Sequence, residues 1–230
     1  MFVQVIQGQI TDAEQVHAAF DRWMEEHHPE APFERYADDI IVHGRSLAQM
    51  QKLKERIAQR LAECGLELHP EKTKIVYCKD GKRRRSHEHE KFTFLSYEFR
   101  PREAVSKSGK FLSFLPAISE EATKKIRKEI QKWKLHRESD RSLEELAQKV
   151  NPQVRGWMQY FGKYYRSKLY EVLLPLQGAL IRWACRKYKK LQRHYGRASN
   201  WLRRISRREP KLFAHWEINV RQTVPSMGAV

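Results

Sequence analysis

The spacing of apolar residues changes near Pro116 and divides the chain into two parts of different secondary structure. Before Pro116, short apolar runs with a period of about two predict strands, including residues 33–36, 40–43, 92–99 and 111–115. After Pro116, apolar residues recur about every 3.6 positions, which predicts helices. We therefore expect an α+β part, a sheet with helices against it, followed by an all-helical part.

The first part also contains two predicted helices. Residues 11–12 can cap a helix that ends at Pro29, although the rest of the N-terminal segment carries only weak signals and no strand is predicted there. A second helix begins at Ser46, where Gln49 completes a capping box, and stops at Gly65.

The helices of the second part begin at serines. Ser119 caps the first, and Ser142 forms a capping box with Glu145 at the start of the second. Proline interrupts helical hydrogen bonding, so Pro152 is expected to kink its helix and Pro175 to break its helix. The expected helices span residues 119–133, 142–157, 167–191 and 198–207.

The chain is strongly basic. Lys and Arg total 45 against 28 Asp and Glu, the formal net charge is +17, and the excess is steepest after Arg155. A polyanionic partner is therefore expected. No apolar run approaches the roughly 18 residues that span a membrane, and the start does not resemble a signal peptide. We expect a cytoplasmic protein without a membrane partner.

Cysteine and histidine give no indication of a metal or disulfide site. Cys64, Cys78 and Cys185 lack CxxC spacing, so neither a disulfide framework nor a zinc site is predicted. His87 and His89 lie in a charged loop without a third ligand nearby and are expected to be solvated.

Asp38 and Asp39 stand side by side at the tip of the predicted hairpin. Adjacent carboxylates repel unless they are protonated or neutralised, and Mg²⁺ is the usual cation where phosphate chemistry takes place. Two-metal nucleotidyl transfer needs carboxylates that hold two Mg²⁺ ions about 4 Å apart, and a tight turn can hold such a pair rigidly. The alternative is an ordinary solvated turn, which the two residue types also fit.

Four segments follow one another along the first part: FDRWM, RYADD, CGLELHPEKTKIV and FTFLSYEFRPR. In this order they resemble the palm of reverse transcriptases, most closely the reverse transcriptase and maturase proteins encoded by group II introns. RYADD matches the third palm motif, and the two longer segments match the fourth and fifth. The resemblance runs from about Phe20 to Trp216 and implies a partial palm followed by a helical thumb and maturase region.

The resemblance implies roles for individual residues. Asp38 is the principal Mg²⁺ ligand of the motif and Asp39 its second carboxylate, while Tyr36 and Ala37 lie beneath the primer end near the incoming nucleotide. Lys72 is implied as a phosphate-facing cation, although a solvated strand-end lysine fits equally well. The implied activity is that of an RNA-directed DNA polymerase, with an RNA/DNA primer-template duplex as a partner.

The chain departs from the family in three places. The family's first palm motif supplies another catalytic aspartate on a strand far upstream, but only Asp12 and Asp21 precede Tyr36, and neither lies on a predicted strand. The glycine-rich second motif is missing, and Ser96 stands where the family usually has glycine. Two metals would have too few ligands here. We therefore expect no polymerase activity from this chain alone unless an upstream N-terminal reverse-transcriptase fragment or a second copy completes the palm.

The segment RGWMQYFGKYYRSKLY, residues 155–170, interleaves cations with aromatic rings. Cations bind phosphate, and exposed aromatic rings stack on unpaired bases. Trp157, Phe161 and Tyr164 follow helical spacing and are more readily explained as core residues. The candidates for RNA contact are Arg155, Tyr160, Lys163, Tyr165 and Arg166.

A second basic segment follows, and no acidic residue occurs between Glu171 and Glu209 to balance it. Phosphate binding is favoured over an ordinary solvated helix face, which carries both signs of charge. RGW.QYFG and RWA.RKYK resemble the maturase segment called domain X, which in the family grips the intron RNA and helps it fold for splicing. The candidate cations are Arg182, Arg186, Lys187, Lys189, Lys190, Arg193, Arg197, Arg203, Arg204, Arg207 and Arg208.

The expected organisation is a divergent segment at 1–19, the C-terminal half of a palm at 20–116, the thumb and maturase region at 117–216, and a tail at 217–230. The tail holds no cysteine and no His-Asn-His pattern, so no DNA cleavage is predicted. Three hypotheses follow: the Mg²⁺-bearing half of a polymerase, a module that clamps structured group II intron RNA in a bacterial-type ribonucleoprotein, or a remnant with an exposed sheet edge that aggregates.

Overall fold

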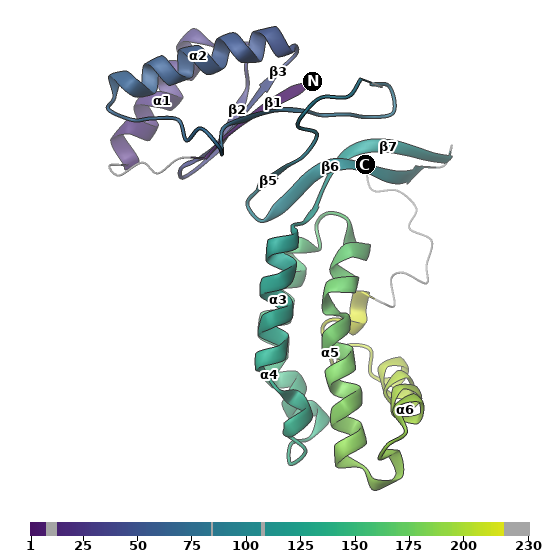
Figure 1. Ribbon diagram of the computed structural model, residues 1–230. Helices are drawn as coiled ribbons and strands as arrows, with labels where there is room; N and C mark the ends of the chain where they lie inside the picture. Colours follow the sequence, from purple (N-terminus) through teal and green to yellow (C-terminus); the bar gives the residue numbers. More distant parts are fainter. Residues whose placement is uncertain (8–12, 84, 107–108, 219–230) are drawn as a thin grey trace. The chain divides into compact units, whose positions relative to one another are not determined.

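The computed structural model describes residues 1–7, 13–83, 85–106 and 109–218. The chain forms two compact units (Figure 1). Unit 1 contains residues 1–94 and 98–115, and unit 2 contains residues 95–97 and the chain from Pro116 onward.

Unit 1 is built on a four-stranded sheet with the order β2-β3-β1-β4. All three neighbouring pairs are antiparallel. The predicted hairpin is present as β2 and β3, whereas the strand β1 was not predicted. The bounds are β1 Phe2–Gln7, β2 Phe33–Tyr36, β3 Asp39–Gly44 and β4 Lys74–Tyr77.

Two helices, α1 (Ala13–His27) and α2 (Leu47–Glu63), cover one face of this sheet (Figure 1). Their apolar residues form a core with alternate residues of the strands. Burial of this apolar surface is the main force that holds the unit together. The core includes Phe2, Ile6, Met24, Ile40, Val42, Met50, Leu53, Ile57 and Tyr77.

The predicted ends of α2 are confirmed, with one difference in the cap. The Ser46 side chain accepts a hydrogen bond from the Gln49 backbone N–H. The Gln49 side chain accepts from the backbone N–H of Arg45, one residue before the position that a full capping box would use. Gly65 follows the helix with φ +74, the left-handed conformation in which glycine ends a helix without strain.

A second sheet has the order β5-β6-β7, with β5 Phe92–Phe94, β6 Tyr97–Ser106 and β7 Gly109–Ile118. The predicted single strand over residues 92–99 is wrong, because the chain turns at Leu95 and Ser96, which have φ 48 and 65. Arg102 is buried and donates to the Glu98 carboxylate at 3.1 Å and to the Leu115 carbonyl at 3.3 Å.

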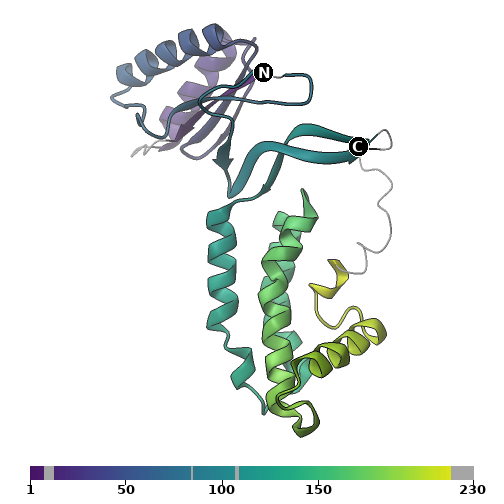
Figure 2. The same cartoon turned by 45° about the vertical axis from the view of Figure 1, so that its right-hand side comes forward.

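Unit 2 is helical, as predicted. Both views show α6 beside α5 (Figures 1 and 2). Ser119 caps α3 by accepting from Ala122, and the Ser142–Glu145 capping box of α4 forms with both of its hydrogen bonds. Two short 3₁₀ helices, η1 Leu135–Arg137 and η2 Lys189–Leu191, connect the longer elements, which are α3 Glu120–Lys132, α4 Leu143–Phe161, α5 Arg166–Lys187 and α6 Tyr195–Arg208.

The predicted break at Pro175 is wrong, since α5 continues through it. The neighbouring Leu173 and Leu176 are fully buried, and their packing offsets the hydrogen bond that proline removes. Asn151 of α4 holds the end of the unit: it donates to the Leu212 carbonyl at 2.8 Å and accepts from the Ala214 N–H at 2.9 Å. Across the ranges given above, none of the helices combines the length and apolar character needed to cross a membrane.

Candidate functional site

The two predicted carboxylates lie at a two-residue hairpin turn. Tyr36, the last residue of β2, pairs with Asp39, the first residue of β3, and Ala37 and Asp38 join them. Ala37 has φ 50, a left-handed conformation that costs a residue other than glycine about 1–2 kcal/mol. Such strained residues cluster at functional sites, where the surrounding structure holds them in place.

The charge of Asp39 depends on its surroundings. Burial, and then the neighbouring Asp38, raise the pKa of Asp39, while Lys72 lowers it. Lys72 of the fourth motif therefore lies near enough to the carboxylate pair to act on it. Tyr36, in contrast, is 64% exposed. Two adjacent carboxylates repel each other, and a bound cation would relieve this repulsion.

The candidate metal ligands at the hairpin are the carboxylates of Asp38 and Asp39. Mg²⁺ is commonly held by one or two carboxylates together with substrate phosphates, which the Asp38–Asp39 pair fits. Within the described ranges, no three side chains of His, Cys, Asp or Glu come together as a metal site would need. Asp21, a carboxylate that precedes the hairpin, accepts hydrogen bonds from Arg35 at 2.8 and 2.5 Å instead.

The strand β1 lies beside the carboxylate hairpin in the sheet. Neighbouring strands are only about 4.8 Å apart, so a strand next to β3 is well placed to bring a further carboxylate to the hairpin. Both positions beside β3 are occupied, by β2 and by β1. The residues of these strands whose backbones pair with Asp39 are Tyr36 and Gln7, and neither residue type is a carboxylate.

The same strand bears on the remnant hypothesis, which needs an exposed edge where a lost strand once paired. β1 pairs with β3 over six residues and with β4 on its other side, so the hairpin strand β3 has no open edge. The edges of this sheet are β2 and β4, each four residues long. Short edge strands are one of the ways in which proteins avoid edge-to-edge aggregation.

Ser96 lies in the turn between β5 and β6 with φ 65. This conformation accounts for the glycine that the family usually has at the position, since glycine adopts positive φ without a steric cost. The Ser96 carbonyl accepts a hydrogen bond from the Ser119 N–H at 2.9 Å and so ties the turn to the cap of α3.

The predicted RNA contacts of the 155–170 segment have different environments. Arg155 and Lys163 are exposed. Tyr160 is 48% exposed, but its hydroxyl donates to the Leu95 carbonyl at 2.9 Å, and its ring centroid lies 5.4 Å from that of Tyr97. Arg166 is exposed and donates to the Gly162 carbonyl at 2.9 Å. Tyr165 is exposed at the N-terminal cap of α5.

The residues expected in the core also differ. Phe161 is buried, Trp157 is half-buried and stacks on Trp133 with 5.6 Å between ring centroids, and Tyr164 is 45% exposed. Tyr164 packs edge-on against Tyr97 at 5.6 Å. One face of the aromatic segment is therefore structural, while parts of Tyr160, Tyr164 and Tyr165 remain open to solvent.

The basic residues of α6 lie opposite its buried side. Ala198, Leu202 and Ile205 face the core. Five arginines of α6 are exposed, and among the residues with described side chains they form no ion pair: Arg197, Arg203, Arg204, Arg207 and Arg208. The positive field extends to His136 near the end of α5, where burial and then Arg186 and Arg182 lower the pKa of the imidazole. Such a surface favours the binding of phosphate.

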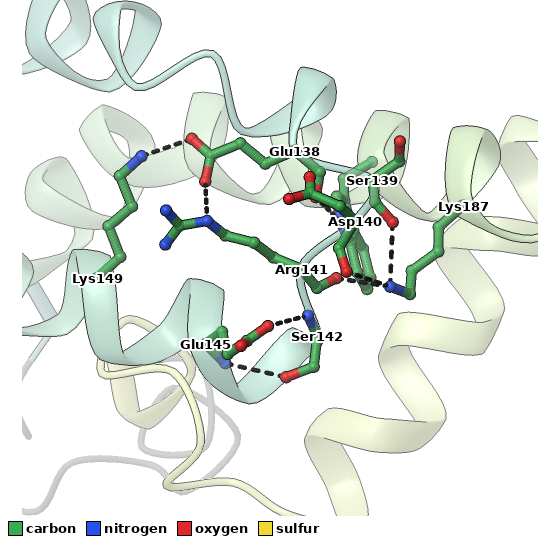
Figure 3. Close-up of polar contacts among 9 residues, drawn as sticks. Glu138, Ser139, Asp140, Arg141, Ser142, Glu145, Lys149 and Lys187 are labelled. Carbon is green, nitrogen blue, oxygen red and sulfur yellow. Dashed lines mark hydrogen bonds and ion pairs between the residues drawn. The ribbon is translucent and has the colours of Figure 1, made fainter.

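Two cations of α5 donate hydrogen bonds to backbone carbonyls of the protein, and Figure 3 shows those of Lys187. Lys187 donates to the carbonyls of Ser139, Asp140 and Arg141 at 3.0, 3.4 and 2.7 Å. Arg186 donates to the His136 carbonyl at 3.3 Å. These two residues hold the loop ahead of α4, and a role in RNA contact stays a prediction for both.

Glu138 connects the same loop to α4 and α5. Its carboxylate pairs with Arg141 at 3.1 Å and with Lys149, and its backbone carbonyl accepts from the Trp183 indole N–H at 2.9 Å (Figure 3). Trp183 is fully buried, so this bond satisfies a donor that would otherwise be orphaned in the core.

Comparison with known families gives two matches along the chain. Residues 10–99 match the reverse transcriptase (RNA-dependent DNA polymerase) family, and residues 123–204 match the maturase-specific domain of group II introns. No curated protein matches the chain. The first match includes the carboxylate hairpin and the second includes the basic helices. Domains of both kinds act on RNA, and reverse transcriptases use divalent metal ions. The chain belongs to the reverse transcriptase and maturase proteins of group II introns.

Proposed function

We propose that the chain binds structured group II intron RNA through unit 2 and does not itself transfer nucleotides. The observation that carries this proposal is the row of exposed arginines on α6 without ion-pair partners among the described side chains. Cations that are not neutralised within the protein are free to release counterions from RNA, which is the main source of affinity for nucleic acid.

The geometry of unit 1 supports the second half of the proposal. The Asp38–Asp39 pair can hold one Mg²⁺ ion, whose chemistry would be to neutralise phosphate oxygens. Transfer of a nucleotide by two metals requires a further carboxylate, and the strands on either side of β3 place Gln7 and Tyr36 opposite Asp39.

Binding of a structured intron RNA at several salt concentrations tests the first half. About six phosphate contacts predict a roughly 10³-fold loss of affinity between 50 and 200 mM salt. Arg197, Arg204 and Arg207 are changed together to Gln. The slope of log affinity against log salt concentration should then become less steep by about one for each arginine that binds a phosphate in the wild type. The matched control changes Arg22, Lys52 and Arg56, exposed cations of α1 and α2, to Gln. A salt response that is flat in the wild type contradicts the proposal.

A second candidate is a polymerase half that an upstream fragment completes. The influence of Lys72 on Asp39 favours it, because a cation beside a metal-binding carboxylate is suited to a phosphate-bearing substrate. For this candidate, an added fragment with the missing catalytic strand must displace β1 from its place beside β3. Primer extension that appears only when such a fragment is added would support the second candidate over the first.

A further inference from the structure

A pocket of about 190 Å³ lies in unit 2 between α5, α6 and the segment that follows α6. Tyr170, Leu174 and Gln177 of α5, Arg203 of α6, and His215 and Trp216 line it. Pockets for drug-sized molecules usually hold about 300–1,000 Å³, so this one suits a smaller group. Nothing in the family matches or in the sequence pattern assigns a role to it.

Two residues of the pocket share one acceptor. The indole N–H of Trp216 donates to Oε1 of Gln177 at 2.9 Å, and Nε2 of His215 lies 3.1 Å from the same oxygen. An indole can only donate, which identifies the Gln177 atom as the oxygen. That oxygen can only accept, so His215 carries its proton on Nε2 and presents a lone pair on Nδ1.

The lone pair of His215 is not used by the described residues. The side chain is 5% exposed, and Nδ1 is buried without a hydrogen-bond partner among them. Burial lowers the pKa of His215 to about 3, so the ring is neutral at physiological pH. A buried acceptor without a partner is unfavourable, and a ligand that donates an N–H to it would remove that cost.

The residues at the mouth of the pocket differ in chemistry from the residues that hold His215. Leu174 is 45% exposed and Arg203 is exposed, and the lining residues that the structure describes include no carboxylate. Tyr170 and Trp216 add aromatic surface. A ligand that fits is therefore flat and apolar on its faces, donates through an N–H at its edge, and carries a negative charge that Arg203 can bind. An unpaired nucleotide has these properties, and unpaired bases are commonly held on aromatic side chains.

We propose that this pocket receives one unpaired base of a bound RNA, with the attached phosphate on Arg203. The proposal rests on the proposed function, namely that unit 2 binds RNA. It adds a point of selectivity for single-stranded segments to a surface that otherwise recognises phosphate.

The test compares a single-stranded oligouridylate with an RNA duplex of the same length. Leu174→Trp places a large ring at an exposed position of the mouth, and Val105→Trp is the control at a position that is 77% exposed in unit 1. We expect Leu174→Trp to weaken binding of the single strand about tenfold, because that much affinity is typical of one stacked base, and to leave duplex binding unchanged. Arg203→Gln should weaken single-strand binding as well, and thermal unfolding checks that both variants fold.

Different outcomes separate the two proposals. If neither RNA binds the wild type, the proposed function fails. If RNA binds but Leu174→Trp and Val105→Trp behave alike, or if Leu174→Trp weakens duplex and single strand equally, the pocket proposal is overturned while the proposed function stands. If the base binds only after residues 219–230 are removed, the chain's own end is the occupant of the pocket. This outcome also overturns the pocket proposal.

The source of the base is tested with uridine monophosphate and protein labelled with ¹⁵N at histidine. Contact with the base should shift the Nδ1 resonance of His215, and the oligouridylate should do so at a lower concentration than the mononucleotide. A mononucleotide that binds more tightly than the oligomer would make the pocket a site for free nucleotides and overturn the assignment to RNA. A resonance that neither ligand moves would contradict the role of His215.

Discussion

The backbone of Gln7 in β1 pairs with that of Asp39 in β3. The strand β1 runs between β3 and β4 in the sheet, and the residue that it pairs with Asp39 is a glutamine and not a carboxylate. The proposal that the chain does not itself transfer nucleotides draws on this pairing, whereas the RNA-binding proposal rests on the exposed arginines of α6.

Ile6→Ala tests whether β1 is part of the core of unit 1. Ile6 is 3% exposed and packs in the cluster beneath α1 and α2. Its truncation should lower the free energy of unfolding by about 2–5 kcal/mol. Hydrogen exchange should lose protection in β1, β3 and β4, whereas Val105→Ala, at an exposed position, should change little. Unaltered protection of β3 in Ile6→Ala would show that β1 does not support the hairpin.

Ser96→Gly should stabilise the protein by up to about 1 kcal/mol. Relief of the positive φ of Ser96 is worth about 1–2 kcal/mol, and the greater freedom of glycine in the unfolded chain offsets part of this gain. The same change at Ser206, inside α6, should destabilise the protein, because glycine has a poor helix propensity. Urea denaturation measures the change in unfolding free energy of each variant. If both changes have the same sign, the inferred strain at Ser96 is contradicted.

Asp39→Asn should stabilise the protein at neutral pH. Because the pKa of Asp39 is raised in the folded state, folding favours the protonated form. The associated stability is present below the ordinary pKa of 3.8 and is lost as the pH rises through the folded value. The difference in unfolding free energy between variant and wild type should therefore be small near pH 3 and favour the variant at pH 7, measured with a chelator present. A difference that grows toward low pH would reverse the inferred sign.

Lys187→Met and Lys190→Met should separate a structural lysine from an exposed one. Lys187 donates to three carbonyls, and loss of hydrogen bonds from a charged group costs about 1.5–3 kcal/mol. Lys190 is exposed, so its loss should leave the melting temperature unchanged and reduce RNA affinity. Calorimetry and RNA titration of both variants give the comparison. If Lys190→Met lowers the melting temperature but binds RNA normally, Lys190 is a structural lysine and the assignment is contradicted.

Several elements could be predicted from sequence because their signals are local. The caps at Ser46, Ser119 and Ser142 depend on residues three positions apart, and all three form. The YADD hairpin and the basic helices likewise follow from short motifs and their order.

Other elements depend on contacts between distant residues. The strand β1 is short, contains two glutamines, and gains its conformation from pairing with β3 and β4, more than 30 residues away in the sequence. The turn at Leu95 and Ser96 could not be predicted, because neither residue favours positive φ. The pocket arises where His215 and Trp216 meet Gln177, residues 38 and 39 positions apart. The spacing of apolar residues along the sequence does not indicate that residues so far apart come into contact.

The central claim is that the chain holds RNA and leaves nucleotide transfer incomplete. Primer extension on an RNA template with Mg²⁺ tests this claim most directly. The assay compares the wild type with the Asp38→Asn, Asp39→Asn double variant. Both proteins are used at a concentration at which template binding has been verified. We expect no extension by either protein. Extension by the wild type that disappears in the double variant would contradict the claim and show that a further carboxylate completes the site.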